Sequence, residues 1–115
     1  MPGNTGMTIK PVRKSRTLEQ LEESYFRDHP REIDLYVKEI FADYAEDGDS
    51  TVLLASLRVI ARVKGVTALA EQTGLSRQGL QKALSGKGNP RLDSINSIMH
   101  ALGYRLKPER VNTRL

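Results

Sequence analysis

The stretch TALAEQTGLSRQGLQKAL, residues 67–84, holds two short helical patterns separated by a turn. The apolar residues at helical spacing are Leu69 and Ala70 before the turn, and Leu80, Ala83 and Leu84 after it. Gly74 can adopt the left-handed conformation of a sharp turn, and Leu75 is expected to plug that turn. Thr67 and Ser76 are residue types that favour helix starts. Two helices joined by a short glycine turn predict a helix-turn-helix.

The second helix of this pair carries polar side chains on the face opposite its apolar residues. Arg77 can form two hydrogen bonds with guanine, and Gln78 and Gln81 can do the same with adenine. These residues cluster at the start of the helix, where helix-turn-helix proteins contact base edges in the major groove. We therefore predict double-stranded DNA as a partner, with base-reading residues Ser76, Arg77, Gln78 and Gln81.

Phosphate contacts are expected around this helix, chiefly in the loop SGKGNPR at residues 85–91. Hydroxyl, amide and lysine side chains bind phosphates and set the register of a protein on DNA. The predicted phosphate-binding residues are Thr67, Lys82, Ser85, Lys87 and Asn89. Alternatively, the glycines of the loop only make a turn. Gly79 costs a helix about 1 kcal/mol relative to alanine, which suggests close approach by a neighbouring helix or by the DNA backbone; simple drift is the alternative.

Four further helices are predicted from the apolar spacing of the remaining chain. The first starts at Thr17 and stops before Pro30, a residue that disfavours helical conformation at the position before it. The second starts at Pro30 and ends at Gly48, and the third is capped by Asp49 or Ser50 and ends at Gly65. The last ends at Gly103. Their expected apolar stripes are Leu18, Leu21 and Tyr25; Ile33, Val37, Ile40, Phe41 and Tyr44; Leu53, Leu57, Ile60 and Ala61, widened by Val52, Val59 and Val63; and Leu92, Ile95, Ile98, Met99 and Leu102.

Together these patterns predict an all-α bundle of five to six short helices. We expect four segments: a disordered basic tail at 1–16, acidic N-terminal helices at 17–49, a helix-turn-helix core at 50–107 and a C-terminal tail at 108–115. The segment that begins at Tyr104 is expected to be either a strand or a docked tail.

Composition limits the classes of protein to consider. The chain has 115 residues and no cysteine, so it holds one domain and neither disulfides nor thiolate sites. It has no run of 18 apolar residues, which excludes a spanning helix, and no secretory signal pattern. A cytoplasmic location is expected. Two histidines and no pocket motif argue against an enzyme, a metal site or a cofactor; the acidic stretch DYAEDGDS lacks calcium-loop spacing.

Charge is unevenly distributed along the chain. Residues 17–49 hold eleven acidic and three basic residues, whereas residues 50–115 hold eleven basic and three acidic ones. A basic region next to the predicted reading helix fits polyanion binding. Random variation of surface charge is the alternative.

The segment GVTALAEQTGLSRQGLQKALSGKGNP, residues 65–90, resembles the lambda-repressor-like (XRE) helix-turn-helix class and, more narrowly, addiction-module antidotes of the HigA type. The likeness covers about residues 33–106, so residues 1–29 lie before it. The resemblance implies a dimer that binds its own operator and neutralises a small RelE/ParE-like toxin. It also places Lys82 with the base-reading residues toward DNA.

Toxins of that group are typically basic, so the acidic segment 17–49 is a candidate toxin-facing surface; a solvated helix face is the alternative. We expect a homodimer that pairs through the last helix and the segment YRLKPERV. The alternatives to an antitoxin are a stand-alone or prophage-type regulator with the same reading helix, and an adaptor that binds protein.

Overall fold

The computed structural model describes residues 16–87 and 89–111. Every regular element in these ranges is helical, so the prediction of an all-α fold is confirmed. The elements are α1 (Arg16–Asp28), the short 3₁₀ helix η2 (Pro30–Glu32), α2 (Ile33–Asp47), α3 (Ser50–Lys64), α4 (Val66–Thr73), α5 (Arg77–Ala83) and α6 (Leu92–Leu102). The predicted basic tail lies outside the described residues, except for Arg16, which begins α1.

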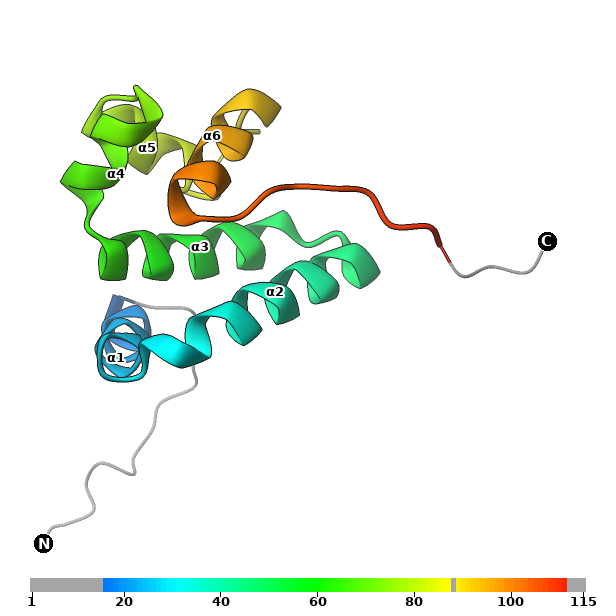
Figure 1. The fold of residues 1–115 in the computed structure, drawn as a ribbon, viewed down its shortest axis with the longest axis horizontal. Coiled ribbons are helices and arrows are strands. Elements are labelled where there is room, and N and C mark those ends of the chain that lie inside the picture. Colours follow the sequence, from blue (N-terminus) through cyan, green and yellow to red (C-terminus); the bar gives the residue numbers. More distant parts are fainter. Residues whose placement is uncertain (1–15, 88, 112–115) are drawn as a thin grey trace, which may run out of the picture.

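Helix α3 runs through the middle of the molecule and contacts helices on both sides. Figure 1 shows α1 and α2 on one side of α3, with α4, α5 and α6 on the other. Eight of the 15 residues of α3 are buried, and Leu57, Val59 and Ile60 are fully inaccessible. A helix that is apolar over most of its circumference is expected to lie at the centre of a core, and α3 does so. Val52, predicted to widen its stripe, is instead exposed.

The ends of the helices follow the expected chemistry. The Asp49 side chain caps α3 by accepting hydrogen bonds from the backbone N–H groups of Thr51 and Val52 at 3.1 and 3.3 Å. Gly48 adopts a left-handed conformation with a φ of 68°, which ends α2. The capping prediction for α3 is therefore confirmed.

Three expected apolar faces are only partly correct. On α2, Ile33, Val37 and Ile40 are buried as expected, but Tyr44 is 40% exposed because it lies beyond the core, near the end of the helix. On α1 the buried apolar side chain is Phe26, whereas Leu21 and Tyr25 are 63% and 44% exposed. The reason is that the buried face of α1 holds Glu19, whose carboxylate pairs with arginines of α3, and Phe26, whose ring packs against Tyr36 of α2. On α6, Ile98, Met99 and Leu102 are buried as expected, but Leu92 at its first position is exposed.

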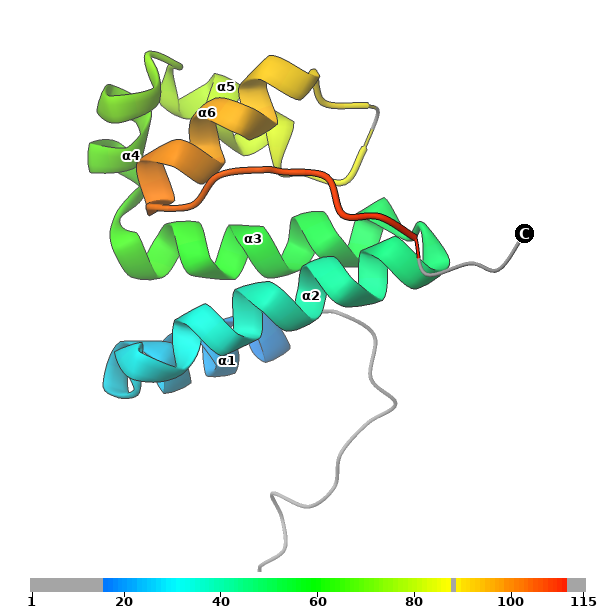
Figure 2. The same cartoon turned by 45° about the vertical axis from the view of Figure 1, so that its right-hand side comes forward.

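The segment after α6 is a docked tail without a strand in its described part, residues 104–111. It passes above α3 toward the end of α2 (Figure 2). The Tyr104 hydroxyl donates a hydrogen bond to the Asp34 carboxylate of α2, and Leu106 lines an apolar cavity with Phe41 and Tyr44. The two alternatives left open by the sequence are thus resolved in favour of docking.

Candidate nucleic-acid interface

A glycine turn joins α4 to α5 as the sequence predicts. Gly74 has a φ of 80°, and its N–H donates to the Ala70 carbonyl at 3.0 Å. The Thr73 hydroxyl donates to the same carbonyl at 3.0 Å and accepts from the Leu75 N–H at 3.2 Å. Leu75 is half-buried and packs against the core. These contacts satisfy the end of α4 and direct the chain into α5.

Ser76 begins α5. Its side-chain oxygen accepts a hydrogen bond from the Gly79 N–H at 2.9 Å. A Cβ atom at Gly79 would lie 3.1 Å from that oxygen, and no neighbouring helix comes within 4 Å of it. The expected close approach of another helix is therefore wrong. Within the described structure, the glycine instead leaves room for the cap of its own helix.

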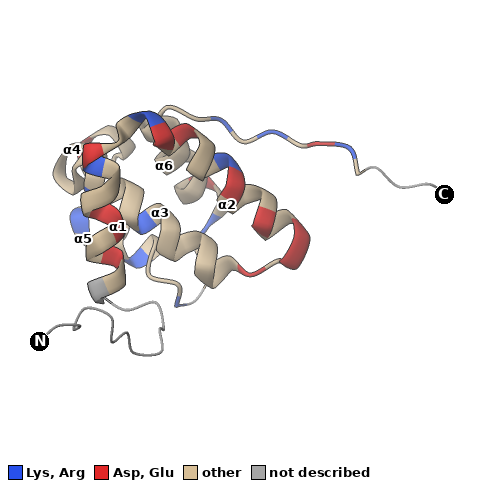
Figure 3. Ribbon diagram, turned by 90° about the horizontal axis from the view of Figure 1, so that it is seen from below, with Lys and Arg blue, Asp and Glu red and all other residues tan. Residues whose placement is uncertain are grey.

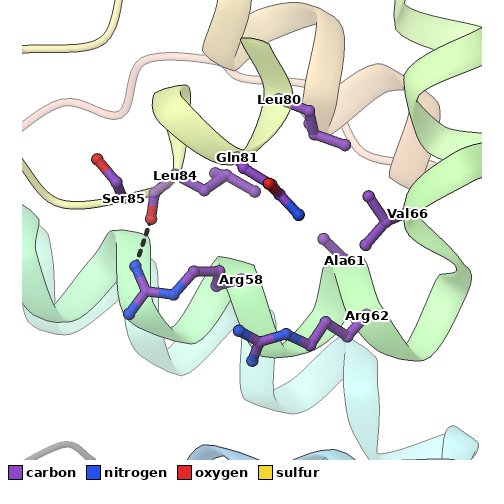
Figure 4. A pocket seen from close by; sticks show the side chains of 8 residues that line it. All are labelled: Arg58, Ala61, Arg62, Val66, Leu80, Gln81, Leu84 and Ser85. Atoms are coloured by element: carbon purple, nitrogen blue, oxygen red, sulfur yellow. Dashed lines mark hydrogen bonds between the residues drawn. The ribbon is translucent and has the colours of Figure 1, made fainter. Parts of the chain in front are cut away.

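The polar face of α5 is accessible. Leu80 and Leu84 are each 1% exposed and hold the helix to the core, while Arg77, Gln78 and Lys82 face solvent. Neither Arg77 nor Lys82 forms an ion pair with another described residue. Gln81 is exposed too, and it extends over a cavity of about 240 Å³ between α3, α4 and α5 (Figure 4). Ser76, Arg77 and Gln78 thus lie at the start of a supported helix, and Gln81 lies one turn after Arg77.

The predicted phosphate-binding residues lie in and around α5, and they differ in whether their side chains are exposed or bonded within the protein. The Ser85 hydroxyl donates to the Lys82 carbonyl at 3.0 Å and accepts from the Lys87 N–H at 3.2 Å, so it organises its own loop. The side chains of Lys87 and Asn89 are exposed. Thr67 is exposed in the first turn of α4, but Gly65 holds the cap position predicted for it.

An ion-pair cluster that the sequence did not reveal lies next to the cavity. The Glu19 carboxylate of α1 is almost fully buried and accepts hydrogen bonds from two arginines of α3, Arg58 at 2.7 Å and Arg62 at 3.1 Å. Burial alone would raise the pKa of Glu19, but the hydrogen bonds from both arginines outweigh it and hold that pKa below its usual value. Arg62 is therefore paired within the protein.

No sequence signal identified this cluster. Glu19 lies in a helix with many acids, and its partners are 39 and 43 residues away. The spacing of Arg58 and Arg62, one helical turn apart on α3, places both on one face. That spacing is the only hint that a shared acidic partner exists.

Acidic and basic residues gather on different elements of the fold. Figure 3 shows acidic residues along α2 and its connection to α3, with basic residues on α3, α5 and the C-terminal tail. Some of these acids have structural roles, since Asp49 caps α3 and Asp47 accepts from the Asp49 N–H at 2.8 Å. Among the described residues, no group of three or more histidines and acids is arranged to hold a metal ion.

The described helices include none that is long and apolar enough to cross a membrane.

Comparison with known proteins places most of the chain in one family. A family model described as "Probable addiction module antidote protein" matches residues 17–110. An uncharacterised protein of Haemophilus influenzae is 34% identical over 95 residues, which cover 80% of this chain and 94% of that protein. No solved structure matches. The family match includes α1, so the expectation that residues 17–29 lie outside the family region is wrong.

Proposed function

Because the chain belongs to the family of probable addiction module antidote proteins, we propose that it binds its own operator through α5 and neutralises a small basic toxin. An antidote family implies a toxin partner. The finer assignments are part of the proposal: a HigA-type protein of the lambda-repressor-like class, a RelE/ParE-like toxin, a homodimer, and a cytoplasmic location. The protein acts by binding and not by catalysis.

The observation that carries DNA binding is the exposed polar face at the start of α5. Arg77 and Gln78 project from a helix that is capped by Ser76 and anchored by two buried leucines. A helix that is supported in this way, with its polar face exposed, fits the major groove, which is about 12 Å wide. Lys82 and Lys87 lie nearby on the exposed side and supply positive charge for the phosphates.

The proposed toxin-facing surface is the acidic side formed by α1 and α2. Glu39, Asp43 and Glu46 are exposed along α2, away from α5. Because the two surfaces belong to different helices, the protein has room for a basic protein on one and DNA on the other. Charge complementarity speeds association and favours the correct partner.

The experiment is a binding assay of the purified protein with its own promoter fragment and with a scrambled fragment of the same length, over a salt series. We expect selective binding to the promoter, with an affinity that falls steeply as salt rises. Equal weak binding to both fragments would contradict DNA recognition by α5.

The product of the neighbouring gene is then added to the same assay. We expect a stable complex that forms equally well with the wild type and with variants of α5. That result would support the acidic surface as the toxin site. If the promoter is bound and no toxin partner exists, the protein is a stand-alone regulator. If the product binds while DNA does not, the helix-turn-helix serves as an adaptor.

A further inference from the structure

The side chain of Arg58 connects α1 to the end of α5. Its Nε and Nη2 donate to the two carboxylate oxygens of Glu19 at 3.3 and 2.7 Å. Its Nη1 donates to the backbone carbonyl of Leu84, a hydrogen bond drawn in Figure 4. A guanidinium can make these contacts together because its donors form a rigid planar fork.

The Leu84 carbonyl lies at the C-terminal end of α5. This helix has seven residues, and Leu84 is its cap residue. The last carbonyls of a helix have no partner within the helix, and so short a helix is stable only through contacts with the rest of the protein. Arg58 supplies a partner at one end of α5, while Leu80 and Leu84 fix its buried side.

Glu19 in turn determines where the Arg58 side chain lies. The Glu19 side chain is 7% exposed and the Arg58 side chain is 25% exposed. The two-pronged contact with the carboxylate holds the guanidinium plane in one orientation, with its third nitrogen toward Leu84. Without the carboxylate, Arg58 has an open cavity beside it and no second anchor.

We infer that Glu19 and Arg58 are positioning residues for DNA recognition: the docking of α1 on α3 fixes Arg58 against the Leu84 carbonyl and thereby fixes how α5 presents Arg77 and Gln78. This inference rests on the proposed function of α5. It makes α1 part of the DNA-reading unit, although α1 itself is acidic and lies on the other side of α3.

The first test is Arg58→Lys, which keeps the charge but loses the fork. We expect the affinity for the promoter fragment to fall about tenfold, a factor typical of losing one or two charged hydrogen bonds. The affinity for scrambled DNA should not change, because it depends on total charge. A purely electrostatic role of Arg58 predicts no change with either DNA.

The second test compares Glu19→Gln with the matched control Glu23→Gln. Both remove one negative charge from α1, but Glu23 pairs only with the exposed Arg27 of the same helix among the contacts described. We expect Glu19→Gln to lower the promoter affinity about tenfold relative to Glu23→Gln. Equal affinities for the two variants would overturn the inference.

Hydrogen exchange of the free protein tests the same link without DNA. The amides of Leu84 and Ser85, bonded to Leu80 and Lys82, should exchange faster in Arg58→Lys and Glu19→Gln than in Glu23→Gln. The amide of buried Ile60 should stay protected, which shows that the variants are folded. Unchanged exchange at Leu84 and Ser85 would contradict the positioning role. If the wild type fails to prefer its promoter while this exchange pattern appears, the proposed function fails and the link from α1 to α5 stands.

Discussion

The start of α5 depends on a few atoms of Ser76 and Gly79. The hydroxyl of Ser76 accepts from the Gly79 N–H, and the missing Cβ of Gly79 leaves space for that hydroxyl. Glycine weakens a helix interior, so its presence here is explained by the cap and not by helix propensity. The two residues therefore act as a pair.

We predict a coupled effect of Ser76→Ala and Gly79→Ala on the free energy of unfolding, measured by urea denaturation. Ser76→Ala should lower it by about 1 kcal/mol because the cap is lost. Gly79→Ala should raise it by about 1 kcal/mol in the Ser76→Ala background, where the methyl group meets no hydroxyl. In the wild-type background the gain should be smaller, because the methyl group presses on the Ser76 oxygen. Equal gains in both backgrounds would show that this contact has no energetic effect.

Arg77 and Lys87 are predicted to differ in how their loss affects DNA binding. Arg77→Ala should cost about 1–3 kcal/mol and relax specificity at one base pair, whereas Lys87→Ala should weaken all sequences alike and reduce the salt slope by about one. Titration of both variants against a panel of single-base operator changes distinguishes the two roles. If both variants lost the same affinity on every sequence, the division into base and phosphate contacts would be contradicted.

At the scale of the helix, regular apolar spacing predicts which residues are buried when the hydrophobic core alone orients the helix. Helix α2 follows its stripe from Ile33 to Phe41, although Tyr44 near its end is 40% exposed. The centre of α3 also follows its stripe, with Leu57 inaccessible. Helix α1 departs from its predicted stripe, because Glu19 pairs with two arginines of α3 and this pairing determines which face of α1 is buried. Such a choice depends on tertiary contact, which apolar spacing within one helix does not contain.

The turn and the exposed residues of α5 were predictable for a different reason. Gly74 makes a turn and Ser76 caps a helix, and both roles follow from the residue type and its local sequence. The self-contained hydrogen bonds of Ser85 were not predictable, since a loop with several glycines can close in several ways.

The orientation of α1 leads to a direct stability comparison between Phe26 and Leu21. Phe26→Ala should lower the free energy of unfolding by about 3 kcal/mol, because its ring is buried and contacts Tyr36 at a centroid distance of 4.5 Å. Leu21→Ala, on the exposed face of the same helix, should change it by less than about 0.5 kcal/mol. Chemical denaturation of both variants measures the difference, and a larger loss for Leu21→Ala would mean that α1 docks by its other face.

The docking of the tail through Tyr104 predicts a pH effect. Burial and the hydrogen bond to Asp34 raise the pKa of Tyr104 to about 12, above the value of about 10 in an unfolded chain. The stabilisation is therefore complete below pH of about 10 and is lost as pH rises toward 12. Tyr104→Phe should lower the free energy of unfolding by about 1 kcal/mol at neutral pH, with the difference from wild type shrinking above pH of about 10. Urea unfolding across pH measures this, and a constant difference would exclude the link.

At the scale of the whole molecule, α3 lies between α1 and α2, which hold most of the acidic residues, and α4, α5 and α6 (Figure 1). We expect two copies to pair by two-fold symmetry through α6 and the segment 104–111, and to place two α5 helices on half-sites about 34–36 Å apart or a multiple of that distance. Footprinting on the operator measures the spacing.

The pairing surface has its own test in solution. Leu92→Asp introduces a charge at an exposed leucine of α6, and Leu35→Asp does the same on α2, where the leucine is similarly exposed. Light scattering should show a monomer for the first variant and a dimer for the second. A dimer that survives Leu92→Asp but not Leu35→Asp would place the interface on α2.

The long separation between α1 and its partners on α3 has a consequence for the lifetime of the protein. Contacts that span about 40 residues close a larger loop than those between α4 and α5, so they form late in folding. By the same reasoning we expect α1 to detach in local openings that leave α4, α5 and α6 folded. Each opening exposes Phe26 and the backbone of α1 to proteases. The rate at which a cell removes this protein would then be governed by the release of one helix and not by global unfolding.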